Sequence, residues 1–378
     1  MKKILIVNAY YYPGFRSGGP QQSMMNLVEI FGDQAEFSVL THNHDFGEIT
    51  PYEGVTHDGW NTVGKARVYY HSKNSFSFNF LQTMANQFDI VYICEPYHDY
   101  AYKLLWLKKH KRVTADMKLA PMGTFSKGAL SQKKLKKKVF WTISSWLNLF
   151  NEIEWSFTSE REHREAIEVI GERNIKRYFI AEDLPRVFVD YGEIVRKPKQ
   201  VGTLKIIFLS RICKQKNLLQ VIKMLSNLKG QIVLDIYGTK EDLAYWQQCL
   251  VALEELPSNV QWAYCGEIDP HKVTDVFSCY EVFCFPTLGE NYGHVIYESL
   301  VAGCIPIISD QTPWNELDGC GVGHTIPLDD ISQYQQWLQK YVDMSEVPFS
   351  NIRKAAMQYA RVKYLKTLKT SGYRRLME

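Results

Sequence analysis

Short apolar runs alternate with helix-periodic segments along most of the chain, and this alternation restricts the fold more than any other feature. In the first half, strands are predicted at KILIVNAY (3–10), EFSVLTH (36–42), ARVYYHS (66–72), DIVYICE (89–95), MKLAPMG (117–123), WSFTSE (155–160) and KRYFIAE (176–182). A helix is predicted from about Gln21 to Phe31 after the first strand. Nearly continuous apolar strands separated by helices indicate a parallel sheet with helices on both faces.

The same alternation starts again after the polar segment RKPKQVGT (196–203). Strands are predicted at LKIIFLS, QIVLDIYG, VQWAYCG, EVFCFPT and IPIISD, with helices between them. A chain of 378 residues is too long for one ordinary core. We therefore expect an α/β protein with two Rossmann-like, doubly wound domains facing a central cleft. The predicted divisions are 1–199, 200–360 and a helical tail, 361–378, that packs back on the N-terminal domain.

Composition excludes several classes of protein. The 44 basic and 41 acidic residues nearly balance, so no partner is selected by bulk charge. The eight cysteines are scattered without C-x-x-C spacing, which favours reduced thiols over a disulfide framework or a zinc cluster. The N-terminal apolar run is short and is expected to form a strand, not a signal peptide. No run of about 18 apolar residues is present, so no membrane span is expected.

One segment, PTLGENYGHVIYESL (286–300), places two glutamates around a strand end and a helix start. Glu290 lies in the turn and Glu298 in the helical pattern. The N–H groups at a helix N-terminus suit an anion such as phosphate. The alternative is that Glu298 is a solvated helix residue and Glu290 only complements the helix dipole.

Two further loops follow predicted strands. SRICKQKN (210–217) carries Arg211 and Lys216, two cations that suit a diphosphate but that could be ordinary surface residues. NAYYYPGFRSGGPQQS (8–23) carries Gly18 and Gly19, which would let the backbone approach a ligand closely, or would form a plain flexible loop. Neither loop has a P-loop or a G-x-G-x-x-G pattern.

A lysine cluster at 127–138 precedes Phe140, Trp141, Trp146 and Phe150. Basic and aromatic residues together suit an anionic membrane surface, and the alternative is a solvated helix face. Nucleic acid is not favoured, because no recognition module accompanies the cluster. No D-x-D pattern is present to hold a divalent metal on a diphosphate, and His42 with His44 is a weak candidate metal pair.

Together these segments resemble the retaining glycosyltransferases of family 4, which have the GT-B fold. GENYGHVIYE is similar to the family's E-x7-E element, SRICKQK to its R-x4-K element, and YYPGFRSGG to its N-terminal glycine loop. ESLVAGCIPIISDQTPW, which follows directly, is also typical. The resemblance covers almost the whole chain and is strongest from about 203 to 330.

The resemblance implies a metal-independent retaining enzyme with a nucleoside diphosphate sugar as donor, a UDP-sugar being favoured over a GDP-sugar. It also implies that the C-terminal domain, 200–360, binds the nucleotide sugar and that the N-terminal domain, 1–199, is the acceptor side. Arg211 and Lys216 would neutralise the diphosphate, Glu290 would contact the donor sugar, and Glu298 would accept from the ribose. The donor-binding residues expected are Gly18, Gly19, Gly238, Ile268, Asn291, Tyr292, Gly293, His294, Val295 and Glu298. The sugar would be a hexose or N-acetylhexosamine, and the acceptor a saccharide, often lipid-linked in the family, in surface polysaccharide biosynthesis.

The chain departs from the family at APMGTFSKGAL (120–130), where Met122, Gly123 and Thr124 stand in a region that often carries a histidine. Two other functions stay open: a nucleotide-sugar epimerase or hydrolase of the same fold, and a non-catalytic partner subunit that binds saccharide or membrane. We expect a cytoplasmic protein, with peripheral contact at the inner face of the membrane through Lys127–Phe150.

Overall fold

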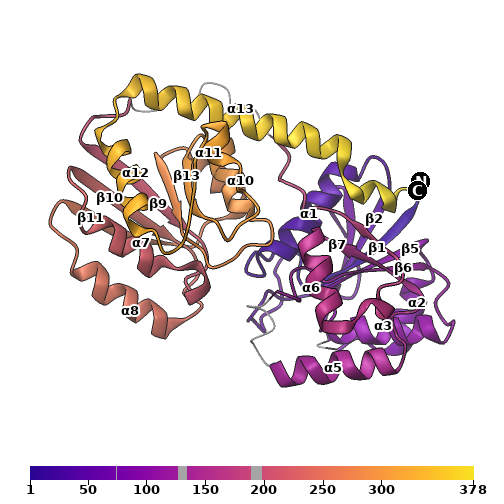
Figure 1. Cartoon of the computed structure of the whole chain (residues 1–378). Coiled ribbons are helices and arrows are strands. Elements are labelled where there is room, and N and C mark those ends of the chain that lie inside the picture. Colours follow the sequence, from indigo (N-terminus) through magenta and orange to yellow (C-terminus); the bar gives the residue numbers. More distant parts are fainter. Residues whose placement is uncertain (74, 127–133, 189–197) are drawn as a thin grey trace. The chain divides into compact units, whose positions relative to one another are not determined.

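The computed structural model describes residues 1–73, 75–126, 134–188 and 198–378 (Figure 1). The chain divides into two compact units. Unit 1 comprises Met1–Val187 and Thr367–Glu378, and unit 2 comprises Phe188–Lys366. The division drawn from the sequence between residues 199 and 200 falls inside unit 2.

Unit 1 is built on one twisted sheet with the strand order β3-β4-β2-β1-β5-β6-β7-β8. Its strands are β1 (Lys3–Val7), β2 (Glu36–His42), β3 (Trp60–Val63), β4 (Ala66–His71), β5 (Ile90–Cys94), β6 (Asp116–Ala120), β7 (Ile153–Phe157) and β8 (Tyr178–Ile180). β3 pairs antiparallel with β4, and the other neighbouring strands pair in parallel. The sequence did not predict β3, a short, partly exposed edge strand that lacks a long apolar run.

The helices of unit 1 are α1 (Gly19–Phe31), α2 (Phe78–Ala85), α3 (Asp99–Lys109), α5 (Lys134–Trp146) and α6 (Glu160–Ile170), with the 3₁₀ turns η1 (Glu172–Asn174) and η4 (Gly372–Leu376). Alternate strand residues point to opposite faces and join different cores. Leu5 and Val7 pack in the cluster that includes residues of α2, α3, α5 and α6. Ile4 and Ile6 pack in the cluster that includes α1 and the chain's last turn. The sheet is therefore buried on both faces, as its apolar strands predicted.

Unit 2 has a parallel sheet with the strand order β11-β10-β9-β12-β13-β14. Its strands are β9 (Thr203–Leu209), β10 (Gln231–Tyr237), β11 (Val260–Gly266), β12 (Val282–Phe285), β13 (Ile305–Ser309) and β14 (His324–Ile326). Its helices are α7 (Leu218–Leu225), α8 (Leu243–Glu254), α9 (Val273–Phe277), α10 (His294–Val301), α11 (Leu317–Cys320), α12 (Ile331–Asp343) and most of α13 (Glu346–Thr370), with η2 (Lys214–Lys216) and η3 (Pro270–Lys272). The predicted strands of this half are confirmed.

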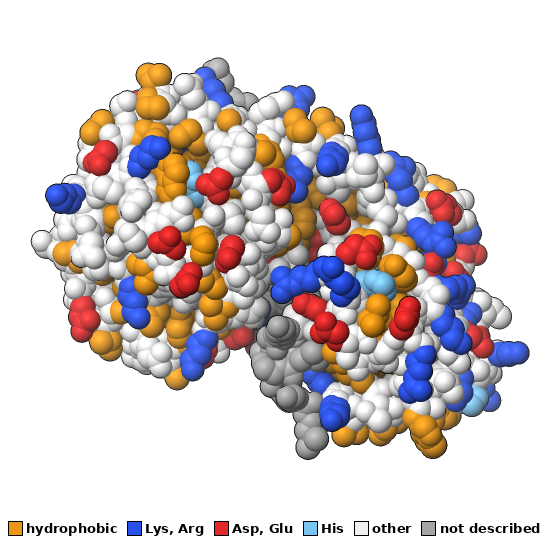
Figure 2. All heavy atoms as spheres, in the orientation of Figure 1, with side chains coloured by type: hydrophobic (Ala, Val, Ile, Leu, Met, Phe, Trp, Pro, Cys, Tyr) orange, Lys and Arg blue, Asp and Glu red, His pale blue; other side chains and the backbone are white. Residues whose placement is uncertain are grey.

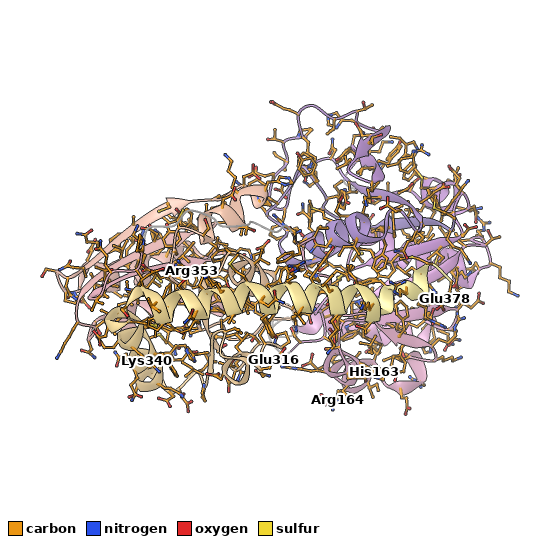
Figure 3. All side chains as sticks on the ribbon, turned by 90° about the horizontal axis from the view of Figure 1, so that it is seen from above. His163, Arg164, Glu316, Lys340, Arg353 and Glu378 are labelled. Atoms are coloured by element: carbon orange, nitrogen blue, oxygen red, sulfur yellow. The ribbon has the colours of Figure 1, made fainter. Side chains whose placement is uncertain are left out.

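The long helix α13 begins in unit 2 and ends in unit 1 (Figure 1). Arg353, labelled on this helix in Figure 3, is buried, and its Nε donates to the Gly303 carbonyl oxygen at 3.2 Å. Its guanidinium carbon also lies 4.8 Å from the centre of the Phe349 ring. These contacts attach the first turns of α13 to the core of unit 2.

The structure confirms the predicted fold class, α/β with two Rossmann-like domains. The eight cysteines are free thiols, and Cys265, Cys279 and Cys320 are exposed. Acidic and basic side chains are mixed over the face shown in Figure 2, in keeping with the near balance of charge. Within the described residues, none of the helices combines the length and apolarity needed to cross a membrane.

Candidate functional site

The strand order of unit 2 identifies where a ligand should bind. From β9 the chain builds outward through β10 to β11, then returns to place β12 on the other side of β9. The connections after β9 and β12 therefore leave the sheet in opposite directions, which defines a topological switch point. In doubly wound sheets, ligands bind outside the carboxyl ends of the strands at such a point.

Lys216 and Glu290 meet at this switch point. Lys216, at the end of η2, is buried, and its Nζ lies 2.5 Å from Glu290 Oε1. The Thr287 hydroxyl lies 3.2 Å from the same carboxylate oxygen. Lys216 Nζ is also 5.7 Å from the centre of the Phe285 ring, at the end of β12. Lys216 is therefore not an ordinary surface cation, and Glu290 does more than complement a helix dipole.

Arg211, just after β9, has a different partner. Its Nη1 lies 2.5 Å from Glu241 Oε2, and both side chains are 40% exposed. The structure thus places Arg211 and Lys216 on the same loop, but it does not bring Arg211 to Glu290. A ligand that uses both cations would compete with Glu241 for Arg211.

The segment after β13 forms hydrogen bonds with the loop that carries Glu290. The Glu290 N–H donates to the Gln311 carbonyl oxygen at 3.1 Å. The Trp314 indole N–H donates to the Tyr292 carbonyl oxygen at 2.5 Å, and the rings of these residues are 5.6 Å apart. Trp314 is buried, so these contacts fix the turn, including exposed Asn291, to the core.

Gly293 ends this turn in the left-handed conformation, with φ of 81° and ψ of 60°. A Cβ at this position would lie 2.8 Å from Ile296 Cδ1, so glycine is required by both space and backbone conformation. Helix α10 starts at the next residue, His294, and directs the positive end of its dipole toward the loop. Val295 packs against the core from the first turn of α10.

Glu298 lies one turn into α10 and is only 6% exposed. The interpretation of Glu298 as a solvated helix residue is therefore wrong. A buried carboxylate is costly unless it is paired or ligated. Its position one turn into α10 keeps it close to the loop that carries Glu290.

The ends of β9, β10 and β11 are joined through Gly238. This residue has φ of 129°, and a Cβ would lie only 1.9 Å from the Ser210 carbonyl oxygen. Its N–H donates to the Gly266 carbonyl oxygen at 2.8 Å, and its own carbonyl accepts from the Tyr264 hydroxyl at 2.9 Å. The backbone at Ser210, just after β9, therefore lies close to the end of β10. Ile268 follows β11 and packs partly exposed against the core.

Gly18 and Gly19 belong to unit 1, where they start α1. Gly18 has φ of 77°, and a Cβ on either glycine would meet no atom within 4 Å. The preceding loop is fixed by buried Asp45, whose carboxylate accepts from the N–H groups of Phe15 at 2.9 Å and Arg16 at 3.2 Å. The loop is thus anchored, and the interpretation of it as a plain flexible loop is not favoured.

Some aromatic residues of the predicted lysine and aromatic patch lie in the core of unit 1, and others lie on its surface. Trp141 and Phe150 are buried, and the Trp141 indole N–H donates to the Tyr97 hydroxyl at 2.7 Å. These two residues pack in the core, so they are not available for a membrane contact. Val139, Ile143 and Trp146 are 49%, 50% and 78% exposed and recur along one side of α5. Lys127 and Lys133, and the side chains of Lys134 and Lys136, lie outside the described residues.

The predicted histidine pair lies at the end of β2. The rings of His42 and His44 are stacked with centres 5.5 Å apart. In the part of the chain that the structure describes, no group of three or more His, Cys, Asp or Glu residues is arranged to hold a metal ion. Burial, followed by the neighbouring His44 and His98, lowers the pKa of His42 to about 4, so its ring is neutral near neutral pH.

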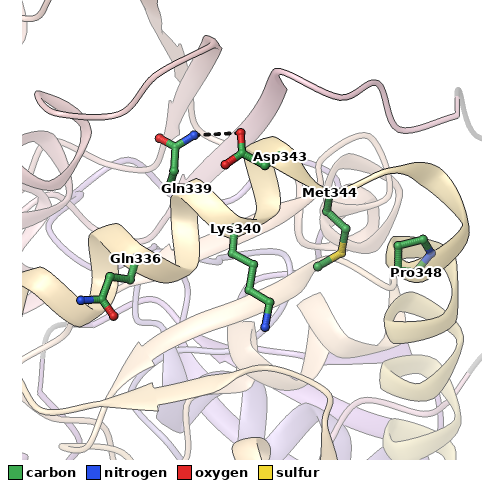
Figure 4. A pocket seen from close by; sticks show the side chains of 6 residues that line it. All are labelled: Gln336, Gln339, Lys340, Asp343, Met344 and Pro348. Carbon is green, nitrogen blue, oxygen red and sulfur yellow. Dashed lines mark hydrogen bonds between the residues drawn. The ribbon is translucent and has the colours of Figure 1, made fainter.

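A hollow beside α12, of about 620 Å³, is lined by Gln336, Gln339, Lys340, Asp343, Met344 and Pro348 (Figure 4). The Gly202 N–H, just before β9, donates to the Val342 carbonyl oxygen at 2.8 Å. This hollow therefore lies at the amino ends of the strands, whereas Arg211 and Lys216 follow the carboxyl end of β9. It is not part of the candidate site.

Two residues of the site were not predicted from the sequence. Glu241 and Thr287 contact Arg211 and Glu290, respectively. Thr287 ends the predicted strand EVFCFPT, so its position at a strand end was the available signal. Glu241 lies near the predicted start of a helix, and nothing in its local pattern distinguishes it from other surface glutamates.

One family model matches part of the chain. Residues 193–324 match the family model described as Glycosyl transferases group 1, so the chain carries a domain of this kind. The match contains both the β9 and the β12 loops of the candidate site. No curated protein sequence matches the chain.

Solved structures resemble the chain along its whole length. Anabaena Alr3699/HepE, solved in complex with UDP and glucose, has a TM-score of 0.67 and 13% identity, with 97% of each chain covered. WaaG, a glycosyltransferase involved in lipopolysaccharide biosynthesis, has a TM-score of 0.66 and 12% identity, also with 97% of each chain covered. Sucrose-phosphate synthase from Thermosynechococcus elongatus has a TM-score of 0.64 and 13% identity, with 100% and 99% covered. The chain has the GT-B fold.

Proposed function

We propose, from the group 1 glycosyltransferase domain on a GT-B fold, that the protein is a retaining glycosyltransferase. It transfers a hexose or N-acetylhexosamine from a nucleoside diphosphate sugar to a saccharide acceptor. The observation that carries this proposal is the largely buried Lys216–Glu290 pair at the switch point of unit 2. In a nucleotide sugar the diphosphate is bonded directly to the sugar. A cation beside a carboxylate can bind both parts, the cation the phosphate and the carboxylate the sugar hydroxyls.

In this proposal Lys216 neutralises the diphosphate as the glycosidic bond breaks. Arg211 joins it by turning from Glu241 to the phosphates, where its planar group can donate two parallel hydrogen bonds. The positive end of α10 faces the same charge. Fixed positive groups aimed at the charge that develops on the leaving group are commonly the largest contribution to catalysis of such a transfer.

Glu290 and Glu298 bind the two ends of the donor. Glu290 accepts from sugar hydroxyls, since its carboxylate is adjacent to the cation that holds the phosphate. Glu298, one turn into α10, accepts from the ribose hydroxyls. The strand ends at Gly238 and Ile268 flank the ribose and base.

The reaction proceeds with retention and without a metal ion in this proposal. The acceptor hydroxyl attacks on the face from which the diphosphate leaves, and the departing phosphate oxygen takes its proton. The bond from the anomeric carbon to phosphate breaks as the bond to the acceptor oxygen forms. Arg211 and Lys216 then balance the diphosphate charge that a divalent metal balances in other enzymes.

The donor is a UDP-sugar rather than a GDP-sugar, supported by the UDP and glucose in the Anabaena structure of the same fold. The acceptor is lipid-linked and belongs to surface polysaccharide biosynthesis, supported by WaaG's role in lipopolysaccharide biosynthesis. The exposed apolar side of α5, with Lys137 and Lys138 beside it, would hold the cytoplasmic protein at the inner face of a membrane.

Calorimetric titration with UDP, GDP and ADP tests the donor site directly. We expect UDP to bind and Lys216→Ala to weaken its binding. Failure of all three nucleotides to bind would refute the proposed function and favour a non-catalytic saccharide-binding subunit.

Incubation of UDP-sugars without acceptor, followed by NMR, tests the class of reaction. Rapid epimerisation or release of the sugar would instead indicate an epimerase or a hydrolase. With an acceptor present, the coupling constant of the new anomeric proton reports retention or inversion.

A further inference from the structure

The hydrogen bond from Trp314 to Tyr292 fixes the direction of a peptide unit in the turn before α10. In a planar trans peptide unit, the C=O and the N–H point in opposite directions. The Tyr292 carbonyl oxygen accepts from the indole N–H of buried Trp314 at 2.5 Å. The N–H of Gly293, which belongs to the same peptide unit, therefore points away from that indole.

The backbone at Gly293 would also allow the opposite direction. Turning a peptide unit over changes ψ of the residue before it and φ of the residue after it by about half a turn, as between type I and type II turns. Gly293 has φ of 81°, and the reversed peptide unit would give it a negative φ. Because glycine adopts both signs of φ with similar ease, backbone conformation alone does not select one direction. The contact with Trp314 does.

The two directions of this peptide unit present opposite charges at the start of α10. In the structure, the positive N–H of Gly293 lies there, beside the positive end of the helix dipole. Within the described part of the chain this N–H donates no hydrogen bond, although Gly293 is buried. Buried backbone N–H groups without a partner are rare in native proteins, so this one indicates an acceptor that a ligand supplies. A reversed unit would present the Tyr292 carbonyl oxygen instead, which repels an anion.

The backbone of Trp314 is itself held on both sides. Its N–H donates to the Thr312 hydroxyl oxygen at 3.2 Å, and its carbonyl oxygen accepts from the Thr325 hydroxyl at 2.8 Å. Its side chain is only 1% exposed and packs in the core of unit 2. The indole therefore has little freedom to move away from the Tyr292 carbonyl oxygen.

Helix α13 supports the indole through Lys363. The Lys363 Nζ lies 4.5 Å from the centre of the Trp314 ring, where a cation is attracted to the face of the aromatic system. The same Nζ lies 3.2 Å from Oε1 of Glu316, which is labelled in Figure 3. The Tyr359 hydroxyl, one turn earlier on α13, donates to that oxygen at 2.6 Å. Glu316 and Tyr359 thus hold the cation that lies over the indole.

We propose that Trp314 is a positioning residue of the donor site. Its indole N–H selects the direction of the Tyr292–Gly293 peptide unit in which the Gly293 N–H donates to a phosphate oxygen of the donor. Lys363 assists by holding the indole in place. This inference rests on the proposed glycosyltransferase function, because the phosphate is that of the nucleoside diphosphate sugar.

Amide NMR on the full chain tests the direction of the peptide unit. With isotope labels on the tyrosine carbonyl carbon and the glycine nitrogen, only a glycine that follows a tyrosine gives a signal. The sequence contains three such pairs: Tyr191–Gly192, Tyr237–Gly238 and Tyr292–Gly293. Tyr292→Phe identifies the Gly293 signal, because that variant loses it. We expect one Gly293 signal in the wild type and a shifted or split signal in Trp314→Phe, which keeps an aromatic ring but has no N–H donor. The other two signals should not move.

Calorimetry tests the consequence for nucleotide affinity, with UDP or whichever of GDP and ADP the wild type binds. Trp314→Phe should weaken binding about tenfold, the effect of misplacing one hydrogen bond to a charged group. Lys363→Met should weaken it about threefold, because it removes the cation from the ring face, and Lys363→Arg should keep the wild-type affinity. Lys354→Met is the matched control, since Lys354 is an exposed lysine of the same helix, and it should bind nucleotide normally.

Thermal unfolding shows whether each variant folds, and Lys363→Met carries the affinity test if Trp314→Phe does not. The inference is overturned if a folded Trp314→Phe keeps the wild-type Gly293 signal or the wild-type affinity. It is equally overturned if Trp314→Phe is unfolded and Lys363→Met binds nucleotide like the wild type. These results would leave the proposed function intact. Failure of the wild type to bind UDP, GDP or ADP would instead refute the proposed function together with this inference.

Discussion

Lys216 and Glu290 form a largely buried ion pair, with side chains 10% and 13% exposed, although they are 74 residues apart in the chain. They meet because β12 returns to pair with β9 after β10 and β11 have been placed on the other side. Removing one member of a buried pair leaves the other charge unpaired, which typically destabilises a protein by about 3–5 kcal/mol. Activity and stability must therefore be measured together at this pair.

Lys216→Ala should lower the rate of sugar transfer by at least about 10²-fold, the effect of removing one fixed donor to a developing charge. Lys214→Ala is the matched control, because Lys214 is an exposed lysine in the same 3₁₀ turn. The measurement is kcat from initial rates of UDP release, with thermal unfolding of both variants. A Lys216→Ala protein that folds normally and keeps a wild-type kcat would contradict the catalytic role.

Glu298→Gln should weaken UDP binding by about tenfold, because the amide offers the ribose a poorer acceptor than the carboxylate. Glu254→Gln on α8 is an exposed control of the same chemistry and should bind UDP normally. Calorimetry distinguishes the two. An unchanged Kd in Glu298→Gln would show that this buried carboxylate supports the fold and not the nucleotide.

The sequence predicted the parts of the donor site but not their pairing. Arg211, Lys216, Glu290 and Glu298 were identified because each follows a strand end or begins a helix, and those local patterns are visible in the chain. In the structure, Lys216 pairs with Glu290 and Arg211 pairs with Glu241. The order of the strands and the paths of the loops determine these two pairings. No local pattern encodes these.

Burial was the other property that the sequence could not resolve. Trp141 and Trp146 lie on the same helix, and nothing in the sequence predicted different burial for them. Trp141 is nevertheless 3% exposed and Trp146 is 78% exposed. The difference depends on which side of α5 faces Phe125 and Trp155, residues on distant segments.

His42 should make the stability of unit 1 depend on pH. Folding lowers its pKa to about 4, chiefly through burial and then through His44 and His98, so the folded state favours the neutral ring. This stabilisation is complete above the unfolded pKa of about 6.5 and is lost as the pH falls toward the folded value. The loss approaches roughly 3 kcal/mol, at 1.36 kcal/mol per pKa unit.

Urea unfolding at about pH 7 and about pH 5, compared between wild type and His42→Gln, measures this contribution. The variant should lose less stability than the wild type on acidification. His110→Gln replaces an exposed histidine and should follow the wild type. Equal pH dependence in wild type and His42→Gln would show that His42 does not titrate as its burial predicts.

The exposed side of α5 should bind anionic vesicles. Val139, Ile143 and Trp146 present apolar surface along one side of the helix, with exposed Lys138 beside them. Each lysine near an anionic surface adds about 1 kcal/mol, an attraction that salt screens. We expect the protein to sediment with phosphatidylglycerol vesicles at low salt and much less at high salt.

Trp146→Glu should reduce vesicle binding by at least about tenfold, since it replaces aromatic area that the membrane would bury with a charge that anionic lipid repels. Trp106→Glu, at a 39% exposed tryptophan on α3, makes the same chemical change elsewhere and should leave vesicle binding intact. Equal sedimentation of the two variants would exclude α5 as the membrane contact, because general loss of positive charge would then explain any weakening.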